Sequence, residues 1–307
     1  MTNQPVSDND WIIHSLNIHG SFFQRKCVDT IINFPLHSVR TRLSLIDTEY
    51  PVEYPPRKML DYRNKESRLD ILARIISENQ PSFAMDIVIE CKKNNPDYTN
   101  WIFFEKYPFN NQKQGFVGAY GDRNGEGFYT SQNVELPGYP ISSEGREVKQ
   151  NYSTINSRDK TRTSNANIED ACYQVILATH SLIDERYIQF TLPLERRENK
   201  KYDLYLFIPM IVTTANLYIC EYNVSDVTSD KGEIPFDKAN LMTVDSLWYE
   251  YPIPPHLQLI NEKWGVSARN AAKDITYRRS IFIVNSVHFV DALLYLSGKS
   301  TVILDFD

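Results

Sequence analysis

The sequence predicts an α/β protein with a mixed central sheet flanked by helices. Short apolar runs with the two-residue alternation of β-strands are interspersed with stretches of helical periodicity, and no segment repeats along the chain. The 307 residues are enough to bury a sizeable core. A hydrophobic content of 42% with a charged content of 23% is typical of a globular protein.

Helical periodicity extends over residues 10–34, where apolar residues recur from Trp11 until Pro35 ends the pattern. Gly20 interrupts it, which predicts either a close packing point or a break between two helices. The next segment, residues 38–50, alternates as a β-strand does.

Two further strands are predicted at residues 67–76 and 83–92, separated by the polar turn SENQPS. If they form an antiparallel hairpin about Gln80, Asp70 lies opposite Glu90 with Cβ atoms about 5 Å apart. In this register one face is wholly apolar and carries Leu69, Ile71, Ala73, Ile75, Ile87, Ile89 and Cys91.

The other face of this hairpin collects Asp70, Glu90 and Lys92 at one end. Two carboxylates this close repel each other unless a cation lies between them, and Mg²⁺ accepts one or two carboxylates while keeping water and phosphate oxygens. A neighbouring lysine can stabilise a developing anion. The arrangement is typical of metal-assisted phosphodiester hydrolysis. The alternative is a solvated sheet face, with Arg74 paired to Asp86 and Glu90 to Lys92.

The composition changes between Asn94 and Asn165, where seven of the eleven glycines fall among mostly polar residues. This predicts a long Gly-rich insertion or lid outside the core. The basic residues Arg158, Lys160 and Arg162 near its end belong either to a solvated loop or to a contact with a phosphate backbone.

The α/β pattern continues in the second half of the chain. An amphipathic helix is predicted at residues 167–186, with Asn167 as its N-cap. The remaining expectations are two buried strands within 202–222 that break near Thr213–Asn216, an irregular stretch over 225–278, a strand over 278–285, a helix over 286–298 that Gly298 ends, and a last strand over 301–307.

Composition and the motifs that are missing narrow the functional classes. A net charge of −6 argues against a chain that coats nucleic acid through bulk electrostatics. The four cysteines form no CxxC pair, which argues against a zinc knuckle and favours a reducing compartment. No signal peptide or membrane-length apolar run is evident, so a cytoplasmic protein is expected. No GxxxxGK(S/T), HExxH or GxSxG motif occurs.

Asp70, followed after nineteen residues by Glu90-Cys91-Lys92, resembles the D…(D/E)xK motif of the PD-(D/E)XK nuclease superfamily. That family includes restriction enzymes, repair nucleases and bacterial anti-phage effectors. Its core consists of a helix, a three-stranded meander, a second helix and a fourth strand. The resemblance implies a restriction-endonuclease-like core over residues 1–222, including the insertion 94–165, with 223–307 as a C-terminal extension packed on the same domain.

The resemblance also implies roles for individual residues. Asp70 and Glu90 would bind Mg²⁺ or Mn²⁺, the main-chain carbonyl of Cys91 would be a further ligand, and Lys92 would be the catalytic lysine. Many members carry an acid four residues after a glycine of the first helix, and Gln24, which can still orient a water, stands there in this chain. Gln174 either supports the site or is an ordinary exposed helix residue.

A metal-dependent nuclease with DNA as its expected substrate is the function that this resemblance implies. Family membership further suggests an endonuclease in bacterial antiviral defence, acting as a homo-oligomer or as a partner subunit of a defence complex. One alternative is a catalytically inactive scaffold or nucleic-acid-sensing subunit of the same fold, which Gln24 favours. Another is an unrelated α/β interaction protein whose hairpin face is merely solvated.

Overall fold

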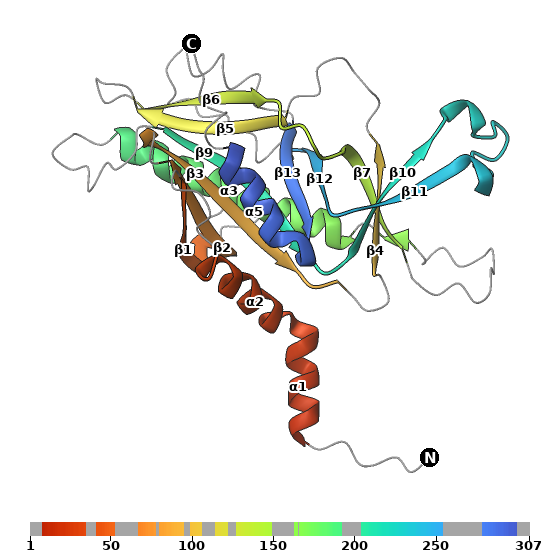
Figure 1. Ribbon diagram of the computed structural model, residues 1–307, viewed down its shortest axis with the longest axis horizontal. Coiled ribbons are helices and arrows are strands. Elements are labelled where there is room, and N and C mark those ends of the chain that lie inside the picture. Colours follow the sequence, from red (N-terminus) through yellow and green to blue (C-terminus); the bar gives the residue numbers. More distant parts are fainter. Residues whose placement is uncertain are drawn as a thin grey trace, which may run out of the picture.

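In the part of the chain that the structure describes, thirteen strands form one mixed sheet with helices on both of its faces (Figure 1). The computed structural model describes residues 8–34, 41–52, 67–77, 80–94, 99–105, 114–121, 127–148, 163–164, 166–191, 204–253 and 278–299. The helices are α1 (Asp8–His19), α2 (Ser21–Ile32), α3 (Ala166–Thr191) and α5 (Phe289–Lys299), with short 3₁₀ turns at Val224–Asp226, Phe236–Lys238 and Ser286–His288.

The strands of the first half of the chain are β1 (Thr41–Val52), β2 (Ser67–Ser77), β3 (Gln80–Lys92), β4 (Asn100–Glu105), β5 (Gln114–Gly121), β6 (Gly127–Val134), β7 (Ile141–Val148) and β8 (Thr163–Ser164). Those of the second half are β9 (Leu204–Thr213), β10 (Asn216–Tyr222), β11 (Ala239–Val244), β12 (Ser246–Pro252) and β13 (Arg278–Asn285). The predicted α/β class with a mixed central sheet is therefore confirmed, as is the break between β9 and β10.

The main path of the sheet is β1-β2-β3-β9-β13-β12-β7-β4-β10-β11. The first three strands form an antiparallel meander, and β3, β9 and β13 then run parallel to one another. At β9 the sheet branches, because β5 pairs with the first half of β9 and β13 pairs with the second half. The carboxyl ends of β3, β9 and β13 therefore lie at one edge of the sheet.

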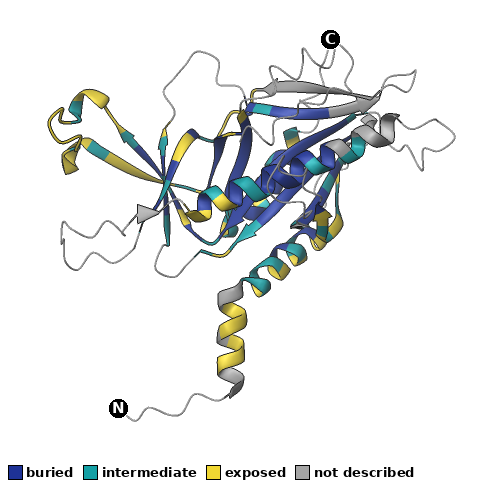
Figure 2. Cartoon of the chain, turned by 180° about the vertical axis from the view of Figure 1, so that it is seen from behind, coloured by how far each residue is buried: buried dark blue, intermediate teal, exposed yellow. Residues whose placement is uncertain are grey.

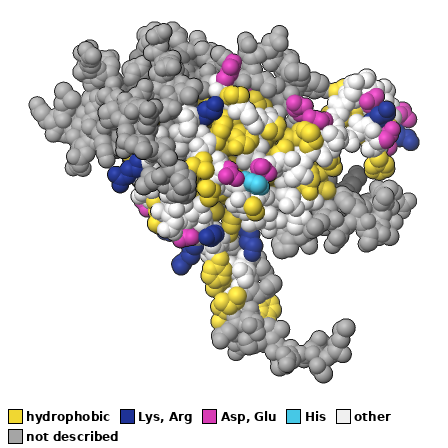
Figure 3. Space-filling view, in the orientation of Figure 1, with side chains coloured by type: hydrophobic (Ala, Val, Ile, Leu, Met, Phe, Trp, Pro, Cys, Tyr) yellow, Lys and Arg dark blue, Asp and Glu magenta, His cyan; other side chains and the backbone are white. Residues whose placement is uncertain are grey.

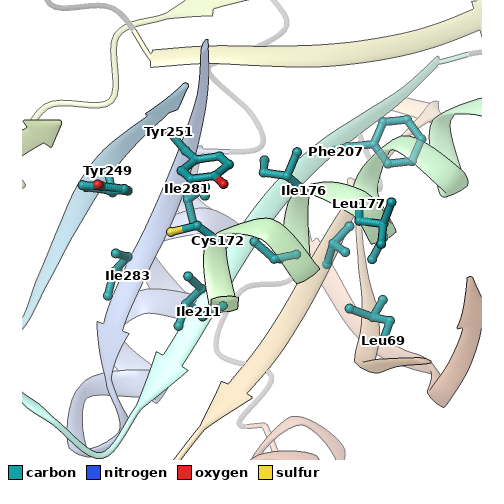
Figure 4. Close-up of a cluster of buried hydrophobic side chains, with 14 of the residues drawn as sticks. Leu69, Cys172, Ile176, Leu177, Phe207, Ile211, Tyr249, Tyr251, Ile281 and Ile283 are labelled. Atoms are coloured by element: carbon teal, nitrogen blue, oxygen red, sulfur yellow. The ribbon is translucent and has the colours of Figure 1, made fainter. Parts of the chain in front are cut away.

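Each face of the sheet has its own hydrophobic layer. Under α3, the side chains of Ile168, Cys172 and Val175 pack on Val88 and Ile211, and Figure 4 shows part of this cluster. On the opposite face, α2 and α5 pack on the sheet through their own apolar side chains, among them Cys27, Ile31, Phe289 and Leu293. Figure 2 shows burial concentrated in the sheet and α3, whereas α1 and the hairpin β10–β11 are mostly exposed.

Gly20 separates α1 from α2, which confirms the second of the two alternatives for this residue. Its φ of 83° lies in the left-handed region that glycine tolerates and other residues avoid. Its carbonyl accepts the N–H groups of Phe23 and Gln24, so it starts α2 in a new direction. In Figure 1, α1 points away from the body of the molecule.

The segment 94–165 is not a lid outside the core, as far as the structure describes it. Its strands β4, β5 and β7 join the central sheet, and the side chains of Trp101, Phe103 and Phe116 are fully or almost fully buried. Composition averaged over the whole segment concealed these strands, because each is short and β5 and β7 contain glycines themselves. The stretch 225–278 was likewise expected to be irregular, yet it contributes β11 and β12.

The beginning of α3 is capped from a distant strand and not by Asn167, which lies in the first turn of the helix. The buried carboxylate of Glu147 on β7 accepts the main-chain N–H groups of Asn167 and Ile168 at 2.7 and 3.1 Å. A carboxylate at this end of a helix satisfies otherwise unpaired donors and the helix dipole. Gly298 lies inside α5 and not after it, and the expected strand 301–307 falls outside the described residues.

None of the helices in the described segments is long and apolar enough to span a membrane.

Two glycine substitutions test whether 94–165 is part of the core. A Cβ at Gly145 would lie 2.7 Å from Cε1 of the buried Phe103, so Gly145→Ala should lower the free energy of unfolding by about 1–3 kcal/mol. The matched control is Gly298→Ala, because a Cβ there meets nothing within 4 Å. Inside a helix this change should add about 0.5–1 kcal/mol. Urea titration measures both, and a neutral Gly145→Ala would favour the lid.

Candidate active site on the β2–β3 hairpin

The β2–β3 hairpin has the register that the sequence predicts. Ile71 pairs with Ile89, Leu72 with Val88 and Arg74 with Asp86. Pairing ends at Ile71 and Ile89, so Asp70 and Glu90 follow the last ladder pair. The two charges still interact, because the charge of Asp70 raises the pKa of Glu90.

The alternation of side chains breaks at Asp70. Ile71, Ala73 and Ile75 belong to the layer under α2 and α5, as predicted, but Leu69 packs in the α3 layer together with Leu72. In a regular strand, residues 69 and 71 would share a face. The placement of Leu69 with the other apolar residues was therefore wrong, because the strand changes its pleat beside the candidate acid.

Asp70 is held by main-chain groups of the neighbouring strand. Its Oδ2 accepts the N–H of Cys91 at 2.7 Å, which fixes the carboxylate next to the Glu90-Cys91-Lys92 segment. On the helix side, Nε2 of Gln24 donates to the carbonyl of Asp70 at 3.2 Å. Gln24 thus touches the main chain of Asp70 and not its carboxylate.

Glu90 and Lys92 form an ion pair along the same strand, with Lys92 Nζ at 3.0 Å from Glu90 Oε1. Lys92 also donates to Oε1 of Gln174 on α3 at 2.5 Å. Gln174 is therefore a partner of the candidate lysine and is only partly exposed. The bond fixes the position of Nζ between the sheet and α3.

A third acid, Glu49 on β1, reaches the site, and no sequence pattern identified it. Its Oε1 accepts Nε2 of Gln24 at 3.3 Å, and its charge raises the pKa of Asp70. Glu49 has a φ of 57°, and the β1–β2 register shifts between Leu45 and Asp47. No local signal predicts this approach, because the bulge that places Glu49 arises only when β1 pairs with β2.

Burial dominates the electrostatics of the two carboxyl groups. It raises the pKa of Glu90 to about 7; the charge of Asp70 adds to the rise, and Lys92 opposes it. Burial also raises the pKa of Asp70, while the N–H of Cys91 and the charge of Lys92 lower it. One lysine thus compensates the buried Glu90 and the partly exposed Asp70 only in part, and a cation between them would favour their ionised forms.

At the opposite end of the hairpin, the buried acid Asp86 has cationic partners within the protein. Asp86 is 0% exposed and accepts two bonds from Arg74, at 2.5 and 2.9 Å. Arg186 approaches it to 3.9 Å, and both guanidinium groups lie over the ring of Tyr205. The cross-strand Arg74–Asp86 pair of the alternative interpretation exists, but it lies far along the strands from Asp70 and Glu90.

The donor set at the site fits Mg²⁺ or Mn²⁺ chemically. Two carboxylates and a main-chain carbonyl, those of Asp70, Glu90 and Cys91, are hard oxygen donors of the kind Mg²⁺ prefers. In the described segments, no group of three or more His, Cys, Asp or Glu side chains is arranged to hold a metal. An ion here would therefore complete its shell with the carbonyl, water and phosphate oxygens.

The other predicted site residues are not assembled by the described structure. Arg158, Lys160 and Arg162 lie outside the described residues, so a nucleic-acid contact there stays a prediction.

Comparisons of this chain with protein-family models, with curated proteins and with solved structures found no match. The case for the site is therefore its geometry and electrostatics.

The raised pKa of Glu90 predicts a pH dependence of stability in the metal-free protein. Because the folded pKa of about 7 lies above the ordinary 4.5, the stability from Glu90 is present below pH 4.5 and lost as the pH rises through 7. Glu90→Gln removes this loss, so the variant should gain up to about 3 kcal/mol relative to wild type between pH 4 and pH 8.

Denaturant unfolding in EDTA at several pH values measures this difference. Glu144→Gln is the control, because Glu144 is exposed on β7 and pairs with Arg146. Parallel curves for wild type and Glu90→Gln would show that burial does not perturb Glu90.

Proposed function

We propose that this protein is a metal-dependent nuclease that hydrolyses the phosphodiester bonds of DNA, with a restriction-endonuclease-like core as its catalytic unit. The observation that carries the proposal is the pair of neighbouring carboxyl groups of Asp70, which is partly exposed, and Glu90, which is buried; both have a raised pKa that the charge of Lys92 offsets only in part. Buried titratable groups with shifted pKa values concentrate at functional sites. The supporting observation is the order α2, the meander β1–β2–β3, α3 and β9, which has the element order of that core once the strands β4–β8 between β3 and α3 are counted as an insertion.

Each residue of the site has a distinct role in this proposal. Bound Mg²⁺ supplies Lewis-acid activation of a phosphate oxygen and of water. The ionised carboxylates of Asp70 and Glu90 hold and orient the ion, and the N–H of Cys91 keeps Asp70 in place. Lys92, held by Gln174, places a positive charge where negative charge develops on the phosphoryl oxygens.

Gln24 acts as a positioning residue in this account. Its amide joins α2 to the carbonyl of Asp70 and to the carboxylate of Glu49, at 3.2 and 3.3 Å. This double contact fixes β2 where its side-chain alternation breaks, and so fixes the direction of the Asp70 carboxylate. Water orientation by Gln24, as the resemblance implies, is compatible with the remaining amide oxygen.

A catalytically inactive scaffold or nucleic-acid-sensing subunit of the same fold is the second candidate. Its specific support is that protein groups already contact both carboxylates: Cys91 N–H bonds Asp70, and Lys92 pairs with Glu90. The raised pKa of both acids favours the enzyme instead, since these contacts do not compensate their burial.

The setting in which the nuclease acts is part of the proposal. Its four cysteines are free, as expected for a protein of the reducing cytoplasm. We place it in bacterial antiviral defence, as an endonuclease that works as a homo-oligomer or with a partner subunit. This placement rests on the resemblance of the D…(D/E)xK motif.

Two substitutions separate the roles of lysine and acid. Lys92→Ala should leave Mn²⁺ affinity largely intact and lower the rate of DNA cleavage by about two to three orders of magnitude, because one preorganised charge is lost. Asp70→Ala removes a ligand, so metal affinity and cleavage should fall together. Plasmid and linear duplex cleavage with and without Mg²⁺, together with calorimetric Mn²⁺ titration, measures both effects.

Lys238→Ala serves as the control, because Lys238 is an exposed lysine next to β11. It should cleave as wild type does. Wild-type cleavage that persists unchanged in Lys92→Ala would refute this site. A wild type that binds Mn²⁺ but cuts no nucleic acid would support the sensing subunit.

A further inference from the structure

Exposed cations gather on the elements that form the candidate site. In the described segments, α2, β2 and the residue after β3 contribute four of them at the end that carries Asp70: Arg25, Lys26, Arg68 and Lys93. Three exposed acids lie on α2 and β1: Asp29, Asp47 and Glu49. Figure 3 shows dark-blue side chains where the N-terminal helices meet the body of the molecule. The exposed cations at this end of the sheet therefore outnumber the exposed acids by one, although the whole chain is acidic.

The hairpin β10–β11 carries the opposite charge. Within residues 221–245 the acids outnumber the lysines; they are Glu221, Asp226, Asp230, Glu233, Asp237 and Asp245, against Lys231 and Lys238. Figure 3 shows several of these side chains at the far right tip. A polyanion is repelled by this hairpin and attracted to the other end of the sheet.

Three of the cations lie close in sequence to residues of the candidate site, on three different elements: Arg25 on α2, Arg68 on β2 and Lys93 after β3. Side chains alternate along a strand, so Lys93 faces the α1–α2 side of the sheet while Lys92 faces α3. Arg25 follows Gln24, whose amide reaches Asp70. Lys93 follows Lys92, and its ammonium group donates to the carbonyl of Asn17 at the end of α1. We call Arg25, Arg68 and Lys93 the cationic ledge.

Arg68 connects the ledge to the site through a chain of contacts. Its guanidinium lies 3.3 Å from Oε2 of Glu49, and Oε1 of Glu49 accepts the amide of Gln24, which also bonds the carbonyl of Asp70. The side chains of Arg68 and Glu49 are 71% and 52% exposed. An ion pair this exposed contributes little to stability, so a phosphate can replace Glu49 as the partner of Arg68.

We propose that the cationic ledge holds the phosphodiester backbone of the substrate, and that Arg68 exchanges Glu49 for a phosphate when the backbone binds. This inference rests on the proposed nuclease function and names the residues that hold the nucleic acid at the α2 side of the hairpin end that carries Asp70 and Glu90. Phosphate contacts of this kind fix the register of the substrate without reading its sequence.

Binding of labelled duplex DNA in EDTA, followed by fluorescence anisotropy, tests the ledge without cleavage. Arg68→Gln and Lys93→Gln should each weaken binding about five- to tenfold at low salt. Each should also reduce the slope of log K against log salt by about 1, as expected for one lost phosphate contact. Glu49→Gln should act in the opposite direction and tighten binding, because it removes the group that competes for Arg68.

Two control variants make the same charge changes elsewhere. Arg278, 57% exposed and 3.2 Å from Glu250, lies at the amino end of β13, so Arg278→Gln should bind as wild type does. Glu144→Gln likewise removes an exposed, ion-paired acid from β7. Folding of all variants is checked by circular dichroism, and Lys93→Gln and Glu49→Gln keep the test decisive if Arg68→Gln does not fold.

The proposed role of the cationic ledge is refuted if wild type does not bind DNA at low salt, or if Arg68→Gln and Lys93→Gln bind DNA as tightly as wild type. A Glu49→Gln variant that binds more weakly also overturns the exchange of partners. Cleavage in Mg²⁺ separates this failure from that of the nuclease. Wild type that cuts DNA while the ledge variants bind normally refutes the ledge alone. Wild type that binds through the ledge and never cuts supports the ledge and refutes the nuclease.

Discussion

The register of the β2–β3 hairpin decides which of its side chains enter each hydrophobic layer and which charged groups lie together at its end. With Leu72 opposite Val88, alternate side chains of both strands face α3, and the others face α2 and α5. Since β1 and β9 cover the two edges of this hairpin, its charged residues have little access to water along most of their length. A slip by one residue would exchange the two faces and bury Arg74 and Asp86 in the wrong layer.

The acids of this hairpin differ in how far neighbouring cations compensate their charge. Asp86 receives two bonds from Arg74 and a second guanidinium from Arg186, so its charge is matched inside the protein. Asp70 and Glu90 share one lysine, and their pKa values rise. If stability were the only requirement, neutral side chains or a full set of cationic partners at the positions of Asp70 and Glu90 would serve it better. The unmatched charge is what a site for a cation and a phosphate requires, and this contrast is the physical basis of the proposed function.

The sequence was sufficient for features that depend on local pattern. The register assumed for the hairpin holds from Ile71 to Ile76, although Ser77 pairs with Gln80 after a register shift. The apolar stripe of residues 167–186 predicted most of α3, and the break near Thr213 separated β9 from β10. Features that depend on distant pairing were missed. The approach of Glu49 needs the bulge in β1, the position of Leu69 needs the altered pleat at Asp70, and the cap of α3 comes from Glu147 on β7.

The strands within 94–165 were missed for a related reason. Each strand is short, and the polar residues and glycines in and around it are as common in loops as in strands. Only the assembled sheet shows that Trp101 and Phe103 of β4 belong to the layer under α3. Gln24, from its place in the motif alone, favoured an inactive site, because a neutral amide stands where many members carry an acid.

In the structure its amide donates to the carbonyl of Asp70 and to the carboxylate of Glu49, and so connects α2 to both strands.

Anomalous diffraction from crystals soaked in Mn²⁺ would show whether Asp70 and Glu90 bind a metal ion, because it locates the ion without requiring a substrate. We expect one anomalous peak within bonding distance of the carboxylates of Asp70 and Glu90 and of the Cys91 carbonyl. Lys92 should then release Glu90 and keep its bond to Gln174. Crystals that show no peak there, with the Glu90–Lys92 ion pair intact at saturating Mn²⁺, would contradict this expectation.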